Sequence, residues 1–160
     1  MRLLAATLFA LTPVSVAALS CTPHSVEAAY LEADGSEARF VVVKGQLEFD
    51  ERKLPKADGG VNQTPPQTTR IKARLSGSVL SRKGFKTPFN KSVTLAVHCF
   101  GPWCASAQQG GEVLAFVEQS EAGDVITTNP CGGFLFHSPT PKMIRAVKGC
   151  FAGRSCKPLR

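Results

Sequence analysis

The fold is decided by residues 98–136, which read HCFGPWC (98–104), a Gly-rich turn (110–111), EVLAFVE (112–118) and DVITTNPCGGFLF (124–136). The stretch holds three of the six cysteines and the single Trp of the chain. Its short β-branched and aromatic runs, separated by turn residues, predict strands. We interpret it as the disulfide-pinned half of a small secreted β-barrel.

Further strands are expected from alternating apolar residues or β-branched runs. Together with those above, the expected strands are 39–49, 70–80, 92–99, 113–118, 125–128 and 134–136. Gly45 and Gly77 lie inside two of them, where glycine favours the bulge or sharp bend that barrel strands need. Residues 50–69 are rich in Pro, Gly and polar side chains and predict a long exposed loop.

A short helix is expected at each end of the sheet. The first covers residues 26–33, with Thr22 as its candidate cap. The last begins after Ser138 or Thr140 and ends at Gly149. These elements predict a mainly β fold. It is a small antiparallel OB-like barrel with a short N-terminal and a C-terminal helix, stabilised by disulfides.

Residues 1–20 have the pattern of a secretory signal peptide. Met1-Arg2 precedes an apolar run, and the small residues Ala18 and Ser20 precede Cys21 at the expected cleavage site. Residues 21–160 are then expected to form one domain, secreted or periplasmic. No later segment reaches the ~18 apolar residues of a membrane-spanning helix, so we expect no membrane span.

All six cysteines follow residue 20, and an even number behind a signal peptide predicts three disulfides. Spacing alone leaves several pairings open. We expect Cys99–Cys104 and Cys150–Cys156 because their loops are short, and Cys21–Cys131, which would tie the N-terminus to the far strand. The alternative is lipidation of Cys21. The residues before it match a bacterial lipoprotein signal poorly, and lipidation would leave one thiol unpaired.

The chain is basic, with 19 Lys and Arg against 12 Asp and Glu and a net charge of +7. In the expected strand 70–80, Arg70, Lys72 and Arg74 alternate with apolar residues and therefore share one face. Arg82 and Lys83 follow in a basic turn. This basic face suits an anionic envelope or glycan surface or an acidic protein, whereas an exported protein meets little nucleic acid. A solvated face that blocks edge pairing is the alternative interpretation.

The sequence shows no catalytic or metal-binding motif. Cys99 and Cys104 are separated by four residues, whereas redox motifs of the thioredoxin type have two. The cysteines and histidines lack zinc-site spacing, and there is no GxSxG nucleophile motif. We therefore predict no enzyme, no metal and no cofactor. Trp103, on the short loop between Cys99 and Cys104, is a candidate binding anchor.

The expected mature chain resembles the netrin/TIMP-like (NTR) family. The resemblance is carried by CTP (21–23), AAY (28–30), the strand 41–47, Cys99 or Cys104, GEVLAFV (111–117) and TTNPCG (127–132). In the inhibitors of this family the N-terminal Cys chelates a protease zinc and the next side chain enters the specificity pocket, which implies these roles for Cys21 and Thr22. The inhibitors carry Cys-x-Cys, whereas Pro23 stands here in place of the second cysteine. The chain is also similar to small exported proteins of Gram-negative bacteria, which implies a periplasmic location.

These features together predict a non-catalytic binding or structural module of the periplasm or extracellular space, with a basic strand face. Two alternatives stay open. One is a metalloprotease inhibitor that acts through Cys21. The other is a thiol-disulfide oxidoreductase that uses Cys99 and Cys104.

Overall fold

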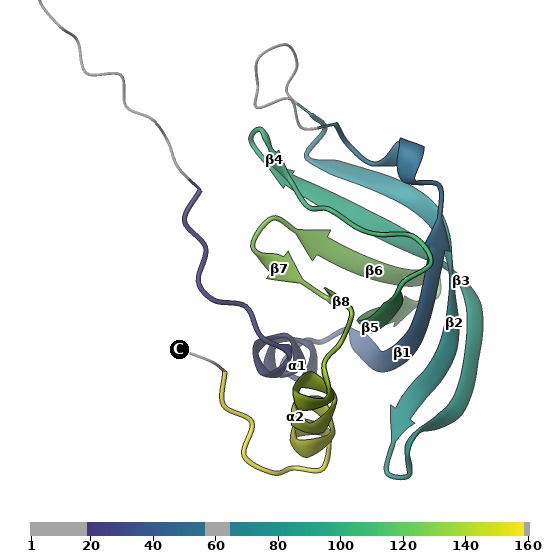
Figure 1. Cartoon of the computed structure of the whole chain (residues 1–160), viewed down its shortest axis with the longest axis vertical. Coiled ribbons are helices and arrows are strands. Elements are labelled where there is room, and N and C mark those ends of the chain that lie inside the picture. The colour runs from purple at the N-terminus through teal and green to yellow at the C-terminus, as the bar shows by residue number, and fades with distance from the viewer. Residues whose placement is uncertain (1–18, 57–64, 159–160) are drawn as a thin grey trace, which may run out of the picture.

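The computed structural model describes residues 19–56 and 65–158. In these residues the elements are α1 (Val26–Asp34), β1 (Arg39–Phe49), the 3-10 turn η1 (Glu51–Lys53), β2 (Thr68–Ser81), β3 (Gly84–Phe100), β4 (Trp103–Cys104), β5 (Glu112–Ser120), β6 (Gly123–Asn129), β7 (Gly132–Gly133), β8 (Leu135–His137) and α2 (Pro141–Phe151) (Figure 1). The signal peptide predicted over 1–20 lies almost wholly outside the described residues. Residues 57–64, the centre of the predicted loop, also lie outside the described residues.

Five strands form a barrel-like ring. β1 pairs with β2 on one side and with β5 on the other, β2 pairs with β3, and β5 pairs with β6, all antiparallel. A parallel pairing of β3 with β6, in register Leu95↔Ile126, closes the ring. The mainly antiparallel β architecture predicted from the sequence is confirmed, and its strands close into a barrel-like ring.

The ring is filled by the alternate residues of its strands. In β2, Ile71, Ala73 and Leu75 point inward and are buried, while Arg70, Lys72 and Arg74 between them are exposed. Val43, Leu47, Leu95, Val97, Val113, Val117 and Ile126 complete this interior core from the other strands. The period-two pattern of the sequence therefore separates core from surface as predicted.

Gly45 on β1 and Gly77 on β2 lie opposite each other in the antiparallel pairing of these strands. A Cβ on Gly77 would lie 2.1 Å from the Lys44 carbonyl oxygen, and one on Gly45 would lie 2.2 Å from the Ser76 carbonyl oxygen. The register runs through this pair without a break, so of the two predicted alternatives, a bulge or a sharp bend, the bulge is absent here. The one shift in the β2–β3 register falls instead between Val79 and Leu80.

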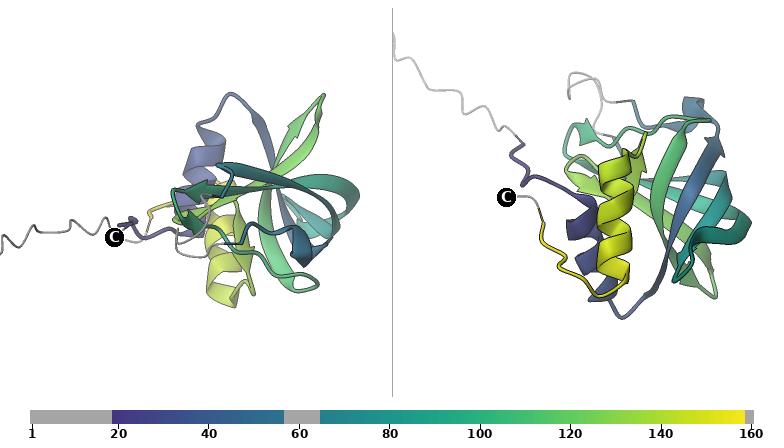
Figure 2. Two further views of the ribbon diagram at one scale, coloured as in Figure 1. Left: turned by 90° about the horizontal axis from the view of Figure 1, so that it is seen from above. Right: turned by 60° about the horizontal axis from the view of Figure 1, so that its bottom comes forward.

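The two helices lie side by side and cover one outer face of the ring (Figure 2). Between helices and sheet is a second core of buried residues: Val26, Ala29, Ala33, Val42, Leu80, Leu114, Phe116 and Val147. Ser25 caps α1 by accepting from the Ala28 N–H, so the predicted cap Thr22 is wrong. Thr140 caps α2 as one of the two expected candidates, but the helix continues past Gly149 to Phe151.

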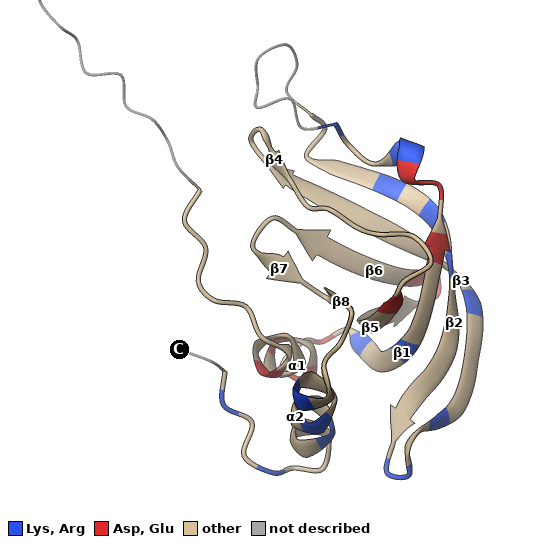
Figure 3. Cartoon of the chain, viewed as in Figure 1, with Lys and Arg blue, Asp and Glu red and all other residues tan. Residues whose placement is uncertain are grey.

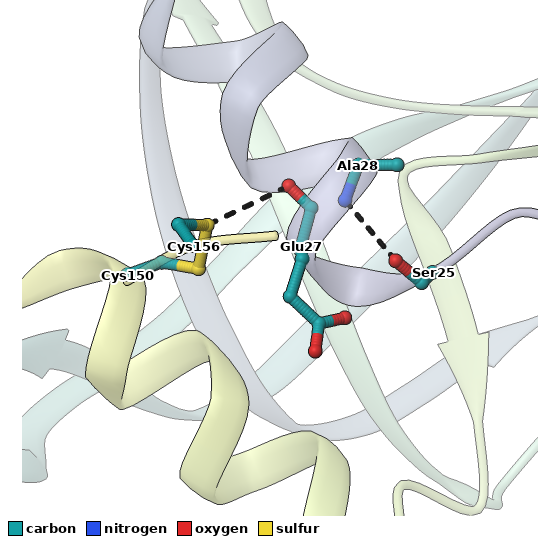
Figure 4. The surroundings of a disulfide bond; sticks show 5 residues. All are labelled: Ser25, Glu27, Ala28, Cys150 and Cys156. Carbon is teal, nitrogen blue, oxygen red and sulfur yellow. Dashed lines mark hydrogen bonds between the residues drawn. A yellow bond between two sulfur atoms is a disulfide. The ribbon is translucent and has the colours of Figure 1, made fainter. Parts of the chain in front are cut away.

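Three disulfides join Cys21 to Cys131, Cys99 to Cys104 and Cys150 to Cys156, as predicted. The Cys150–Cys156 bond holds the chain after α2 against α1, where Cys156 Sγ lies 3.8 Å from the Glu27 carbonyl oxygen (Figure 4). A disulfide sulfur carries no hydrogen, so this is a packing contact. Because Sγ of Cys21 is already bonded, it has no free thiol for a lipid. Three disulfides indicate an oxidising environment, extracellular or periplasmic.

No helix among the described residues is long and apolar enough to cross a membrane.

Candidate functional site

The five basic residues predicted as one face lie in two separate places (Figure 3). Arg70, Lys72 and Arg74 lie on the outer face near the start of β2, whereas Arg82 and Lys83 form the turn between β2 and β3. Arg74 and Arg82 are eight residues apart, up to about 26 Å along a strand. One ligand head group therefore cannot contact both sets, and each must be judged by its own surroundings.

The strand set lies among polar and acidic partners. The Arg74 guanidinium donates to the Asn90 side-chain oxygen, and Glu48 is its cross-strand neighbour on β1. Lys72 lines a shallow hollow that also contains Asp124, whose carboxylate pairs with Lys91 at 3.2 Å. Positive charge on this face is thus partly balanced by acidic side chains, which is typical of a solvated strand face.

The turn set lines a hollow that the sequence did not predict. Arg82 and Lys83 meet Lys148 and Arg154 from α2 and the segment after it, around an opening of about 580 Å³. We call this the basic hollow; Leu80, Ser81, Gly84, Phe151 and Ala152 complete its lining.

Lys148 on α2 reaches the turn between β2 and β3. Its Nζ lies 3.6 Å from the position that a Cβ on Gly84 would take, an ordinary van der Waals distance. The same Nζ lies 5.7 Å from the centre of the Phe85 ring, a cation–π distance. The Arg154 side chain returns to α2, where its Nε lies 3.9 Å from the position that a Cβ on Gly149 would take.

The basic hollow has no acidic residue in its lining. Arg82, Lys83, Lys148 and Arg154 are all exposed, and none of the ion pairs among the described residues involves them. The carboxyl end of α2 contributes roughly half a negative charge, which four cations outweigh. Such a concentration of one sign raises the local concentration of anions and speeds their association.

A second hollow of about 290 Å³ adjoins the basic one. We call it the apolar hollow; it lies between α1, β1 and the end of α2. Both share Leu80 and Phe151 as lining residues. The rest of its lining is Tyr30, Ala33, Asp34, Ser36, Ala38, Phe40, Val41, Val42 and Phe116. Burial, and then the charge of Asp34, raise the pKa of Tyr30 above its ordinary value.

Lys148, Phe151 and Arg154 were missed by reasoning from the sequence. One signal was available: Lys142, Arg145 and Lys148 recur every three residues on the side of α2 that faces away from Val147. A basic amphipathic helix of this kind is a pattern of helices that meet anionic surfaces. Its contact with the basic turn, however, depends on the packing of α2 against the ring.

Trp103, the predicted anchor, is 39% exposed, and Phe100 on the same loop is 41% exposed. The loop ends in the Cys99–Cys104 disulfide across β3 and β4. Trp103 borders a hollow that also includes Cys21, Pro102 and Pro130. Cys99 is 5% exposed, which does not suit the accessible thiolate that thiol exchange needs.

No group of three or more His, Cys, Asp or Glu that could hold a metal occurs within 19–56 and 65–158. His24 Nε2 lies 2.6 Å from the Gly133 carbonyl oxygen, and its ring stacks on Phe136. His137 has a buried Nε2 without a partner, and burial lowers its pKa. The surroundings of His24 are therefore structural.

No known protein-family model, curated protein or solved structure matches this chain.

Proposed function

We propose that this chain is a non-catalytic binding module of an oxidising compartment and that its basic hollow holds an anionic partner. One observation carries the proposal: Arg82, Lys83, Lys148 and Arg154, from two distant parts of the chain, surround one opening whose lining has no carboxylate. Candidate partners are an anionic glycan or envelope surface or an acidic protein. The strand set, Arg70, Lys72 and Arg74, is then a solvated face that adds only long-range attraction.

The strength of such binding should depend on salt. Exposed ion pairs contribute up to about 1 kcal/mol each, so loss of two cations should weaken binding by up to about 30-fold. Screening acts over about 8 Å at physiological ionic strength, so distant cations contribute little there. A cation of the basic hollow should therefore matter more than one on the strand face.

The test compares two double variants with the same change in net charge. Arg82→Gln/Lys148→Gln removes two cations of the basic hollow, and Arg70→Gln/Lys72→Gln removes two from the strand face. Affinity for a heparin oligosaccharide, the anionic probe, is measured by titration calorimetry at several salt concentrations. We expect the first variant to bind at least tenfold more weakly and the second to bind within about threefold of the unchanged protein. Equal losses in both variants would contradict a site at the basic hollow, and absence of binding would contradict the function.

We infer a second candidate function from Cys21. This residue is exposed and borders the hollow of Trp103 and Pro130, so the N-terminal segment and the Trp103 loop form one surface. That arrangement supports an inhibitor of the NTR type, in which an N-terminal cysteine meets the metal of a protease. The mechanism requires a free Cys21 amine. Sequencing of the mature protein from its native source tests it, because any other first residue excludes chelation by Cys21.

A further inference from the structure

We propose that the basic hollow and the apolar hollow together hold one anionic single-chain amphiphile, a free molecule with a phosphate or carboxylate head group and an acyl chain. The assignment rests on the function proposed above and names the class of its ligand. The head group lies among Arg82, Lys83, Lys148 and Arg154, and the acyl chain extends past Phe151 into the apolar hollow.

The geometry for one continuous ligand comes from the wall that the hollows share. Leu80 and Phe151 line both, so a molecule that leaves the basic hollow across these side chains enters the apolar one directly. Leu80 faces the helices because it follows Val79, which points into the ring, and successive side chains of a strand point to opposite faces. Phe151 is the last residue of α2 and stays 40% exposed, at the place where an acyl chain would cover it.

Part of the apolar hollow offers surface that suits an acyl chain. Phe40 and Phe151 are partly exposed there, while Val42, Phe116 and Ala33 form the buried floor beneath them. Contact with such side chains removes apolar ligand surface from water, which is the main source of affinity for an acyl chain. Pockets for small molecules are generally lined in this way, with a few polar groups that fix orientation.

Charge fixes the direction of the ligand. Asp34 lines the apolar hollow, whereas four cations line the basic hollow. Figure 3 likewise shows acidic residues on α1 and basic residues on α2. An anionic head group is repelled by the α1 end and attracted by the α2 end. A cationic head group is repelled by the four cations and would have to point the other way, toward Asp34, which makes the head-group charge a test of the assigned direction.

The experiment uses monomeric dodecyl phosphate as the probe, below its micelle concentration, and measures affinity by titration calorimetry. Butyl phosphate keeps the head group without the long chain, and dodecyl maltoside keeps the chain without the charge. We expect dodecyl phosphate to bind at least tenfold more tightly than either. Equal affinity for butyl and dodecyl phosphate would overturn the proposal, and so would binding only to vesicles of anionic lipid.

Variants then locate the chain. Ala38→Trp should fill the apolar hollow and weaken dodecyl phosphate binding at least tenfold, while affinity for the heparin oligosaccharide stays within about threefold. Phe151→Ala is a second variant, with Phe100→Ala as its matched control because Phe100 has the same exposure at another site. Far-UV and near-UV circular dichroism verify folding of each variant.

The outcomes separate the two proposals. Heparin binding that is sensitive to Arg82→Gln/Lys148→Gln, without any gain from a longer alkyl chain, would refute the amphiphile and leave the proposed function in place. Failure of both heparin and dodecyl phosphate to bind would refute both.

Discussion

Replacement of Cys21 and Cys131 by alanine should destabilise the protein more than removal of either other disulfide. The Cys21–Cys131 bond spans 110 residues, whereas Cys99–Cys104 and Cys150–Cys156 span 5 and 6. A cross-link restricts the unfolded chain, and the restriction grows with the logarithm of the loop length.

The magnitudes follow from these lengths. In the chain-entropy treatment, a loop of 110 residues corresponds to about 4.8 kcal/mol and loops of 5 or 6 residues to about 2 kcal/mol. Packing narrows the gap, because Cys99 and Cys150 are buried while Cys21 is exposed. Loss of the buried sulfur adds about 1 kcal/mol to the cost of each short-loop variant. We therefore expect Cys21→Ala/Cys131→Ala to cost about 2 kcal/mol more than Cys99→Ala/Cys104→Ala.

Urea unfolding of the double variants, followed by circular dichroism, measures the difference. The slope of free energy against urea also reports changes in the unfolded chain, since a chain without the long cross-link exposes more surface and should give a larger slope. The reasoning would be refuted if the Cys21–Cys131 variant were as stable as the Cys99–Cys104 variant. In that case the N-terminal segment would be held by its other contacts.

Three further predictions concern single residues. Gly77→Ala should lower the free energy of unfolding, measured with urea, by at least about 3 kcal/mol, because its Cβ would lie 2.1 Å from the Lys44 carbonyl oxygen. Gly111→Ala is the control and should be nearly neutral, because a Cβ there has nothing within 4 Å. Equal effects of the two variants would contradict the close approach of β1 and β2 at Gly77. Burial lowers the pKa of His137 in the folded state, so the unfolded chain takes up a proton before the folded protein does as pH falls below ~6.5. The free energy of unfolding should therefore decrease as pH falls from ~6.5 toward the folded pKa. His137→Gln should remove this part of the pH dependence, and parallel curves of stability against pH from 5 to 7.5 for the two proteins would count against it. Trp103, the single Trp, should be quenched by acrylamide in the folded protein to a degree between a buried and a free indole, and full protection would disprove the exposed loop.

Strands with a clear alternation were predictable from sequence. The bounds of β1 match the prediction, because Val43, Leu47 and Phe49 are inward positions of an uninterrupted pattern. The first half of β3 was missed because Pro88 lies inside it and proline seldom occurs within paired strands. In the described structure β6 pairs only with residues 94–97 of β3, so the other side of Pro88 is open and its nitrogen can face that side.

The candidate site was only half predictable. The sequence placed Arg82 and Lys83 in a basic turn, but it joined them to Arg70, Lys72 and Arg74 because all five are close along the chain. Their true neighbours, Lys148 and Arg154, are more than sixty residues away and reach the turn through the packing of α2 against the sheet. Local periodicity contains no information on which turn a helix will meet.

The open side of β3 also bears on how copies of this protein meet one another. An unpaired strand edge can accept a strand from a second molecule and start aggregation. Here the free edge holds Pro88, which has no N–H to offer, between Lys86 and Lys91, which repel an identical edge. This segment of β3, which pairs on one side only in the described structure, is thus protected against self-addition.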